Sequence, residues 1–349
     1  MLYSPHLITH RIMPENQEFP MLSLSSRITP EHLFYRRNHF PYPNVDMRFW
    51  RLSIEGCVNK PLYFRYDNLL NMPQVTLPVT LECVGDKRSF FQPKTRGEQW
   101  GLGAISHAVW TGVRLQDLLH AADVQGNARE VTFEGMDKGA RTDMPGVFSY
   151  KRSLSLEHAL HLDTIVALYM NGKPLPYRHG YPARLIVPGW YGMASVKWLH
   201  RIVVIEEPFQ GPFQVVDYVL ARNPISPSSP EPITTIRLNS TIAGPVDQEV
   251  LARGENWIWG IAISGNAPVI QVEISLDNGN SWLVASWMEQ QEAYSWRRWC
   301  WKWTVTVPGT YDIKVRAKDA AGNVQSEMAD WNVNGYGYSA IQHIRVYID

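Results

Sequence analysis

Two patterns of hydrophobic and polar residues divide the chain. In the last third, apolar residues alternate with polar ones, as in a strand that buries one face. Such runs cover residues 270–276, 299–307 and 311–317, and the turn Asp277-Asn278-Gly279 follows the first of them. Short strands of period two, separated by turns of this kind, predict an immunoglobulin-like β-sandwich.

The larger N-terminal part mixes both periods. Apolar residues occupy every second position over residues 75–81, just before Cys83. This pattern places the cysteine at or just past the end of a strand. The apolar positions of residues 115–122 follow helical spacing, Ser155 can cap a short helix, and residues 183–188 form another strand. This half therefore predicts an α+β fold that carries its chemistry on loops.

A stretch rich in Pro and Ser, residues 223–232, separates the two patterns and is typical of a linker. The chain of 349 residues has the length of two domains. We expect an N-terminal extension over residues 1–30, an α+β domain over 31–222, the linker over 223–232, and a sandwich over 233–349.

Composition narrows the classes of partner. Lys plus Arg equals Asp plus Glu at 33 each, and this balance disfavours a nucleic acid or an anionic membrane surface as partner. The longest apolar stretch, residues 164–170, falls short of the ~20 residues that span a bilayer. No export signal stands at the start, which predicts a cytoplasmic protein; a leader removed earlier would make it periplasmic instead.

Three cysteines are too few for a disulfide framework, and none forms a CxxC pair. Common signatures of nucleotide, zinc-protease and serine-hydrolase sites are missing, and Gly101-Leu-Gly103 is only a fragment of a dinucleotide loop. Cys83 precedes a tight loop with Lys87 and Arg88. Positive charge nearby favours the thiolate, a soft metal ligand, although a buried inert cysteine is the alternative.

Two further clusters carry cationic and hydrogen-bonding side chains. Arg37, Asn38 and His39 stand together, and His179, Arg184 and Lys197 lie within a segment shaped by Pro and Gly. Both clusters offer donors for an oxyanion or a phosphate, whereas solvated surface turns are the alternative.

These segments resemble the molybdenum domain of the sulfite oxidase family, which includes the assimilatory nitrate reductases. The matching pieces include Arg37-Asn-His39, Thr80-Leu-Glu-Cys83 with Gly85 and Arg88, Trp100 before Gly103-Ala-Ile-Ser106, Phe133-Glu-Gly135 with Asp137, Met170-Asn-Gly172, His179-Gly180 with Arg184, Val187-Pro188-Gly189 and Val196-Lys197-Trp198. The segment 272–277 with Trp282 resembles the family's dimerisation domain, which implies a homodimer.

The resemblance implies a molybdopterin cofactor whose molybdenum takes one protein sulfur, that of Cys83. It implies that the pterin and its phosphate are held by Asn38, His39, Asp137, His179, Arg184, Ser195, Val196 and Lys197. In the sulfite-oxidising branch an oxygen atom passes from the metal centre to sulfite. Arg37 and Arg88 match arginines that bind this small inorganic anion, Trp100 matches a pocket tryptophan, and Tyr218 matches a tyrosine near the transferred oxygen.

The sequence departs from the family pattern at two points. Asp86-Lys87 stands where Asn-Arg is common. At the position of a further substrate arginine the register of the resemblance gives a tryptophan, although Arg297 and Arg298 are adjacent. Nothing resembles a haem domain, so we expect a separate electron acceptor such as a cytochrome. Reduction of nitrate or of another oxyanion or S-oxide is the nearest alternative, and a non-catalytic immunoglobulin-like scaffold is an alternative of another class.

Overall fold

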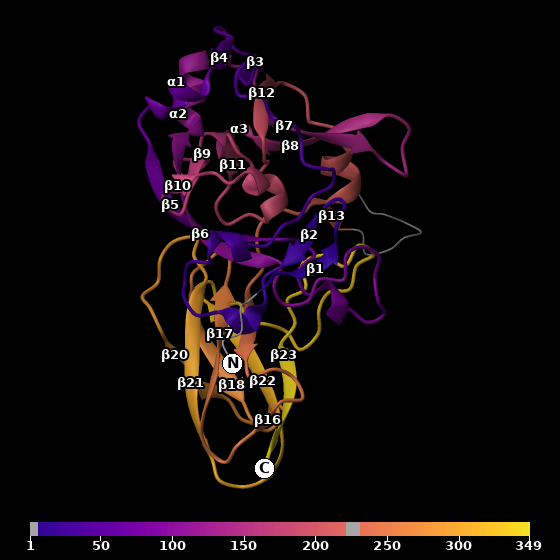
Figure 1. Ribbon diagram of the computed structural model, residues 1–349, viewed down its shortest axis with the longest axis vertical. Helices are drawn as coiled ribbons and strands as arrows, with labels where there is room; N and C mark the ends of the chain where they lie inside the picture. The colour runs from indigo at the N-terminus through magenta and orange to yellow at the C-terminus, as the bar shows by residue number, and fades with distance from the viewer. Residues whose placement is uncertain (1–5, 221–230) are drawn as a thin grey trace.

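The structure, a computed structural model, describes residues 6–220 and 231–349. It is elongated, with the N-terminal part at one end and the sandwich at the other (Figure 1). Most of the predicted linker, residues 223–230, lies outside the described residues. Within the described ranges, no helix is both long and apolar enough to cross a membrane.

The N-terminal part is built on two five-stranded sheets, which agrees with the α+β prediction. In the first sheet the order is β10-β9-β6-β5, with β11 also paired to β9; its strands are β5 (Val75–Glu82), β6 (Ile105–Arg114), β9 (Ile165–Met170), β10 (Lys173–Pro174) and β11 (Arg184–Ile186). In the second the order is β4-β3-β12-β7-β8; its strands are β3 (Leu52–Gly56), β4 (Leu62–Phe64), β7 (Glu130–Ala140), β8 (Val147–Ser155) and β12 (Leu199–Ile205). Only the β12–β3 pair of the second sheet is parallel.

Three short helices accompany these sheets: α1 (Tyr66–Leu70), α2 (Leu115–Ala122) and α3 (Leu156–Ala159). The helical spacing predicted over residues 115–122 is confirmed, and the four apolar side chains at this spacing are fully buried. Ser155 caps α3 as predicted, because its hydroxyl accepts a hydrogen bond from the backbone N–H of His158. The strand predicted at residues 75–81 is β5, and Cys83 follows its last residue.

The C-terminal part is a sandwich of two sheets, as the alternating pattern predicted. One sheet has the order β15-β17-β21-β20: β15 (Asn239–Gly244), β17 (Gly254–Ile263), β20 (Ser286–Trp287) and β21 (Arg297–Val305). The other has the order β16-β23-β22-β18-β19: β16 (Val250–Leu251), β18 (Val269–Ser275), β19 (Leu283–Val284), β22 (Gly309–Asp319) and β23 (Gln342–Ile348).

Two apolar side chains that the alternation predicts to face the core are exposed instead. They stand at the start of the first predicted run and at the end of the second. Ile270 is 56% exposed because the pairing of β18 with β22 shifts register between Val269 and Gln271, which turns Ile270 outward. Val307 is exposed because β21 already ends at Val305. Between these points Val272, Ile274 and the partners from β22 fill the sandwich core.

The described residues before position 30 pack on the N-terminal domain. The hairpin β1 (Ile8–Arg11) and β2 (Asn16–Glu18) lies near the junction of the two parts (Figure 1). Just after it, the N–H of Phe19 donates to the carbonyl oxygen of Gly103 at 2.8 Å. A Cβ added to Gly103 would lie 1.8 Å from the Phe19 carbonyl oxygen, so this glycine serves close backbone packing.

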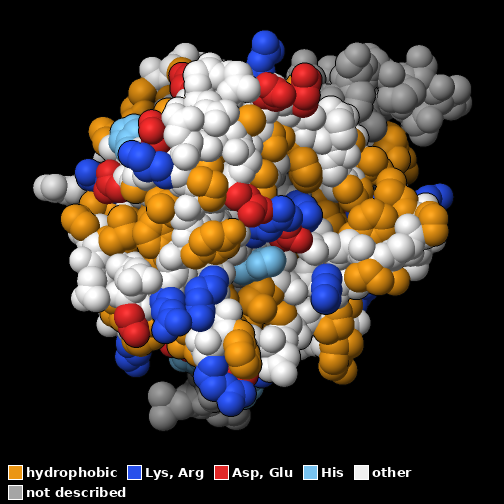
Figure 2. All heavy atoms as spheres, turned by 90° about the horizontal axis from the view of Figure 1, so that it is seen from above, with side chains coloured by type: hydrophobic (Ala, Val, Ile, Leu, Met, Phe, Trp, Pro, Cys, Tyr) orange, Lys and Arg blue, Asp and Glu red, His pale blue; other side chains and the backbone are white. Residues whose placement is uncertain are grey.

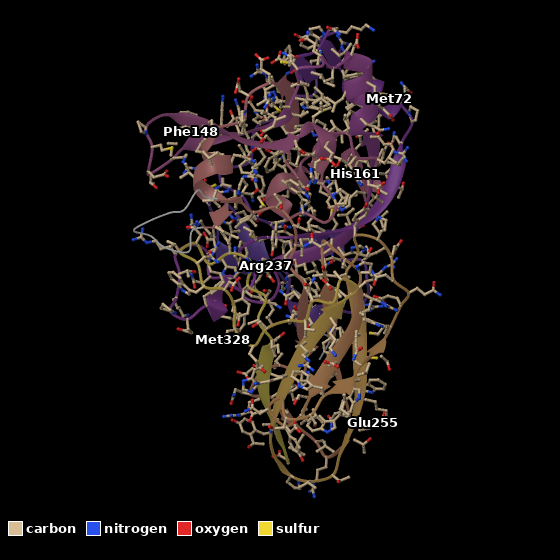
Figure 3. The ribbon with its side chains drawn as sticks, turned by 180° about the vertical axis from the view of Figure 1, so that it is seen from behind. Met72, Phe148, His161, Arg237, Glu255 and Met328 are labelled. Carbon is tan, nitrogen blue, oxygen red and sulfur yellow. The ribbon has the colours of Figure 1, made fainter. Side chains whose placement is uncertain are left out.

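Lys87 joins the two domains and is fully buried at 1% exposure. Its Nζ donates to Asn239 Oδ1 at 2.8 Å and to the Ser240 carbonyl oxygen at 3.0 Å, both on β15. Arg237 lies in the same junction (Figure 3) and donates to the Gly337 carbonyl oxygen. The two domains are therefore connected by buried hydrogen bonds as well as by apolar contacts.

Lys87→Met is expected to lower the free energy of unfolding by about 3–5 kcal/mol, because it leaves the buried carboxyl groups of Glu82 and Asp86 without their cation. Urea unfolding followed by circular dichroism measures the change. The matched control is Lys302→Met, whose half-exposed ion pair with Glu255 is worth less than about 1 kcal/mol. Equal stability of the two variants would contradict the role of Lys87.

Candidate active site

A cavity of about 680 Å³, including the space at its open mouth, lies in the N-terminal domain. Its walls come from the segment before β3, the end of β5, strand β7, and the loops around residues 179–197. Ten of the thirteen predicted site residues line it: Arg37, Asn38, His39, Cys83, Asp137, His179, Arg184, Ser195, Lys197 and Tyr218. Residues separated by up to 181 positions thus meet at one place.

Cys83 is 8% exposed and is held in the cavity wall by its backbone. Its N–H donates to the Ala104 carbonyl oxygen at 2.8 Å, and its own carbonyl oxygen accepts from Asp86 at 2.8 Å. Burial raises the pKa of the thiol, while Arg37 and Arg88 act to lower it. A bound metal cation would replace the proton, because the thiolate is the metal-ligating form.

The prediction that Lys87 places a positive charge beside Cys83 is wrong. The Lys87 side chain points into the domain junction, since it donates to Asn239 and Ser240. Arg37 takes the place of that cation, because it lines the cavity together with Cys83.

Arg184 and Lys197 form the basic part of the cavity. Arg184 donates to the carbonyl oxygens of His179 at 3.0 Å and Ser195 at 3.1 Å. Lys197 donates to Asn38 Oδ1 and, at 3.1 Å, to the Arg37 carbonyl oxygen. Burial, followed by the charge of Arg184, lowers the pKa of Lys197 to about 7, and burial lowers that of Arg184 to about 10. An anion bound here would favour the charged form of both groups.

Two buried polar atoms of this wall have no hydrogen-bond partner among the described residues. They are Oδ1 of Asp137 and Nε of Arg184. Burial raises the pKa of Asp137 to about 6, and the charge of Lys197 opposes this rise. An unpaired acceptor and an unpaired donor in one cavity indicate a ligand that carries both N–H groups and anionic oxygens. A pterin with a phosphate has both kinds of group.

The two histidines of the cavity are uncharged. Burial lowers the pKa of His39 and of His179 well below the ordinary value, and nearby cations, Arg37 and Arg184 foremost, lower them further. His39 Nε2 shares a hydrogen bond of 2.7 Å with the Tyr218 hydroxyl. Neutral imidazoles can donate on one nitrogen and accept on the other, which suits the heterocyclic edge of a pterin.

Tyr218 is 5% exposed and stands in an aromatic wall. Its ring is stacked on that of Tyr336 with centroids 5.7 Å apart. Tyr150 stacks on His39 at 5.3 Å and donates its hydroxyl to the Met193 carbonyl oxygen at 2.8 Å. These contacts fix the phenol of Tyr218 at the cavity that Cys83 also lines.

A second hollow adjoins the cavity and shares Arg37, Asn38 and His39 with it. We call it the vestibule; its other lining residues are Arg11, Pro14, Asn16, Arg88, Arg96, Gly97, Glu98, Asn334 and Tyr336. Arg88 lies in the vestibule only, with Nη1 donating to the Glu98 carbonyl oxygen and its guanidinium 5.1 Å from the Tyr336 ring centroid. The four arginines that line this hollow favour the binding of an anion.

Four candidate residues lie outside the cavity lining and the vestibule. Trp100 is fully buried with its ring edge against His10, and Val196 belongs to the domain core. Arg297 lies 4.1 Å over the Trp287 ring, and Arg298 pairs with Glu289 at 3.0 Å.

Three residues that line the cavity or contact Tyr218 were absent from the sequence-based candidates. Tyr150 and Arg152 come from β8, and Tyr336 comes from the C-terminal domain. Because side chains alternate between the two faces of a strand, Tyr150 and Arg152 lie on the same face of β8. This period was the one feature of the sequence that could have indicated both residues. Tyr336 stands in a Gly-Tyr-Gly-Tyr segment of no clear period, so only the three-dimensional structure places it at the site.

Comparison with known proteins shows the family of both domains. The family model for an oxidoreductase molybdopterin binding domain matches residues 39–213, and that for a Mo-co oxidoreductase dimerisation domain matches residues 231–348. The chain is 34% identical to sulfite oxidase of Arabidopsis thaliana over 95% of this chain and 91% of that protein. It is 35% identical to mitochondrial sulfite oxidase of Homo sapiens, covering 99% of this chain and 66% of the human protein.

The chain is also similar to a nitrate reductase and to a sulfane dehydrogenase. Nitrate reductase of Hordeum vulgare is 36% identical over 92% of this chain and 40% of its own length. The crystal structure of the sulfane dehydrogenase SoxCD from Paracoccus pantotrophus superposes with a TM-score of 0.84 at 27% identity, covering 96% of this chain and 85% of that one.

Proposed function

Because the chain belongs to the sulfite oxidase family of molybdopterin-binding oxidoreductases, we propose that it oxidises sulfite to sulfate and passes the two electrons to a separate acceptor. The enzyme class and the molybdenum–molybdopterin cofactor follow from the family. The substrate and the acceptor are the proposal. The balance is sulfite plus water giving sulfate, two protons and two electrons.

The residues of the cavity fit this cofactor. Among the described residues no group of three or more His, Cys, Asp or Glu side chains could hold a metal ion, so a metal at Cys83 has to bring its other ligands with it. The dithiolene of molybdopterin supplies such ligands, and the bound cofactor supplies two-electron oxygen-atom transfer. Asp137 and the neutral histidines would hold the pterin, while Arg184 and Lys197 would hold its phosphate.

The observation that carries the choice of sulfite is the meeting of Tyr218, Arg37 and Cys83 in one cavity. Arg37 also lines the vestibule, so an anion drawn in by Arg88 and Arg96 reaches a cation at the boundary of the two hollows. The Tyr218 hydroxyl can donate a hydrogen bond to the oxygen atom that is transferred in the reaction. Burial raises the pKa of this phenol well above its usual range, which keeps it a donor at neutral pH.

Tyr218→Phe is expected to lower kcat about a hundredfold, because it deletes one donor aimed at charge that develops during the reaction. Molybdenum content should stay at the wild-type level, since Tyr218 is not among the phosphate-holding residues. Steady-state kinetics with metal analysis measures both. The control is Tyr311→Phe, whose hydroxyl bonds a carbonyl oxygen of the sandwich. Loss of molybdenum from the Tyr218 variant would contradict the assigned role.

Steady-state assays decide between sulfite and its rivals. Sulfite is offered to the molybdenum-loaded enzyme with ferricyanide and then with a cytochrome c as acceptor. Robust turnover is expected, and reduction of the cytochrome would support an electron acceptor of that kind. Full molybdenum occupancy without turnover would overturn sulfite as substrate. Nitrate and S-oxides with a reduced dye are then the test of the second candidate, an oxyanion reductase with the same cofactor.

The sandwich supports a homodimer, because it matches the dimerisation domain of the family. On the end of the molecule that carries the N-terminal domain, basic and acidic side chains are interspersed (Figure 2).

A further inference from the structure

Arg152 is a buried cation that the mechanism above does not use. It lies on β8 and is 1% exposed. One of its terminal nitrogens, Nη1, donates to the Phe213 carbonyl oxygen. Its Nε and Nη2 are buried and have no hydrogen-bond partner among the described residues. A guanidinium group carries five N–H donors and stays charged at neutral pH, so burial with unpaired donors is costly and calls for an explanation.

The carboxylate nearest in sequence to Tyr218 does not neutralise Arg152. Asp217 accepts a two-pronged pair of hydrogen bonds from Arg141, at 2.6 and 2.8 Å. Arg141 also pairs with Asp143 at 2.6 Å. The charge of Arg141 is therefore compensated twice, whereas no ion pair to Arg152 is found among the described residues. A net positive charge remains on Arg152.

The group that faces this charge is the ring of Tyr218. The Arg152 guanidinium carbon lies 5.5 Å from the Tyr218 ring centroid, within the range of a cation–π contact. The stacked ring of Tyr336 and the hydrogen bond to His39 hold the same phenol. Arg152 thus belongs to the set of contacts that fixes Tyr218, although it does not line the cavity.

We propose that Arg152 is a positioning residue that acts through Tyr218: it fixes the phenol and strengthens its hydroxyl as a donor to the anion in the cavity. The cation draws electron density from the ring, and its field favours negative charge on the phenolic oxygen. The O–H then gives a stronger hydrogen bond to an oxyanion. The inference rests on the proposed function in that the anion is taken to be sulfite or its product, sulfate.

Binding of sulfate to the oxidised holoenzyme, measured by calorimetry, tests this role without turnover. R152M is expected to weaken sulfate binding about tenfold, because the Tyr218 hydroxyl then gives up most of one hydrogen bond to the anion. R152K keeps the charge and should bind within about threefold of wild type. R201M is the control, because Arg201 lies on β12 and is paired with Glu55 and Glu134. The dissociation constant does not depend on the fraction of protein loaded with cofactor.

Adding Y218F separates action through the phenol from a structural effect. In the Y218F background R152M should cause no further loss, because the group through which it acts is gone. Wild-type affinity in R152M, a tenfold loss in R152K, an additive double variant, or no sulfate binding by wild type would each overturn the proposal. An enzyme that binds sulfate with this dependence but does not oxidise sulfite would overturn the proposed function alone.

Discussion

Cys83→Ser is expected to reduce sulfite turnover below about a hundredth of wild type, because weakening even the partners of a metal ligand costs ten- to a hundredfold. Serine is a harder, more weakly acidic donor than the thiolate, so the metal loses its soft protein ligand. The fold should persist, since the backbone hydrogen bonds to Ala104 and Asp86 hold this turn and serine preserves them. Activity per molybdenum and the circular dichroism spectrum are the measurements.

Cys300→Ser is the matched control. Cys300 is a free, half-buried cysteine on β21 of the sandwich, outside the cavity. This variant should keep wild-type activity. Full activity of the Cys83 variant would show that its sulfur is not the ligand, and an unfolded Cys83 variant would show instead that the residue is structural.

Lys197→Met is expected to weaken cofactor retention about ten- to a hundredfold, because it removes one charge-assisted hydrogen bond to an anion. Lys197 is the cation that holds Asn38 and the Arg37 backbone in the cavity wall. Removing it takes away one of the two charges assigned to the pterin phosphate. Molybdenum and pterin content after dialysis measure the loss.

Lys138→Met is the control, because Lys138 is an exposed residue beside Asp137 on β7. It should retain the cofactor. If the Lys197 variant keeps full molybdenum after dialysis and loses only activity, the phosphate site lies elsewhere and the assignment of Lys197 is wrong.

The sequence predicts those parts of this fold that repeat or match a motif. The alternation around Val272 and Ile274 predicts the sandwich, and the alternation before Cys83 places the cysteine at a strand end. The ten cavity residues come from matched motifs, most of them on loops fixed by glycine and proline, such as Gly180 beside Arg184. Short-range pattern and motif order therefore suffice to name most of the candidate residues that line this cavity.

Other features depend on contacts that no local pattern contains. In the sequence Lys87 looks like an exposed cation of the loop after Cys83. Its hydrogen-bond partners, Asn239 and Ser240, are more than 150 positions distant in the chain, and they hold its side chain away from Cys83. Tyr336 reaches the site from the second domain in the same way. Arg152 looks like a polar residue of a half-exposed strand, and only the packing of Tyr218 and Phe213 over it makes it a buried charge.

The most direct test of the central claim is a single turnover without an external acceptor. Oxidised, molybdenum-loaded enzyme is mixed anaerobically with excess sulfite, and the sulfate formed is counted against molybdenum. The account predicts one sulfate per molybdenum, since each site can accept two electrons once. No sulfate from a fully loaded enzyme would contradict sulfite oxidation at the cavity that Cys83, Arg37 and Tyr218 line.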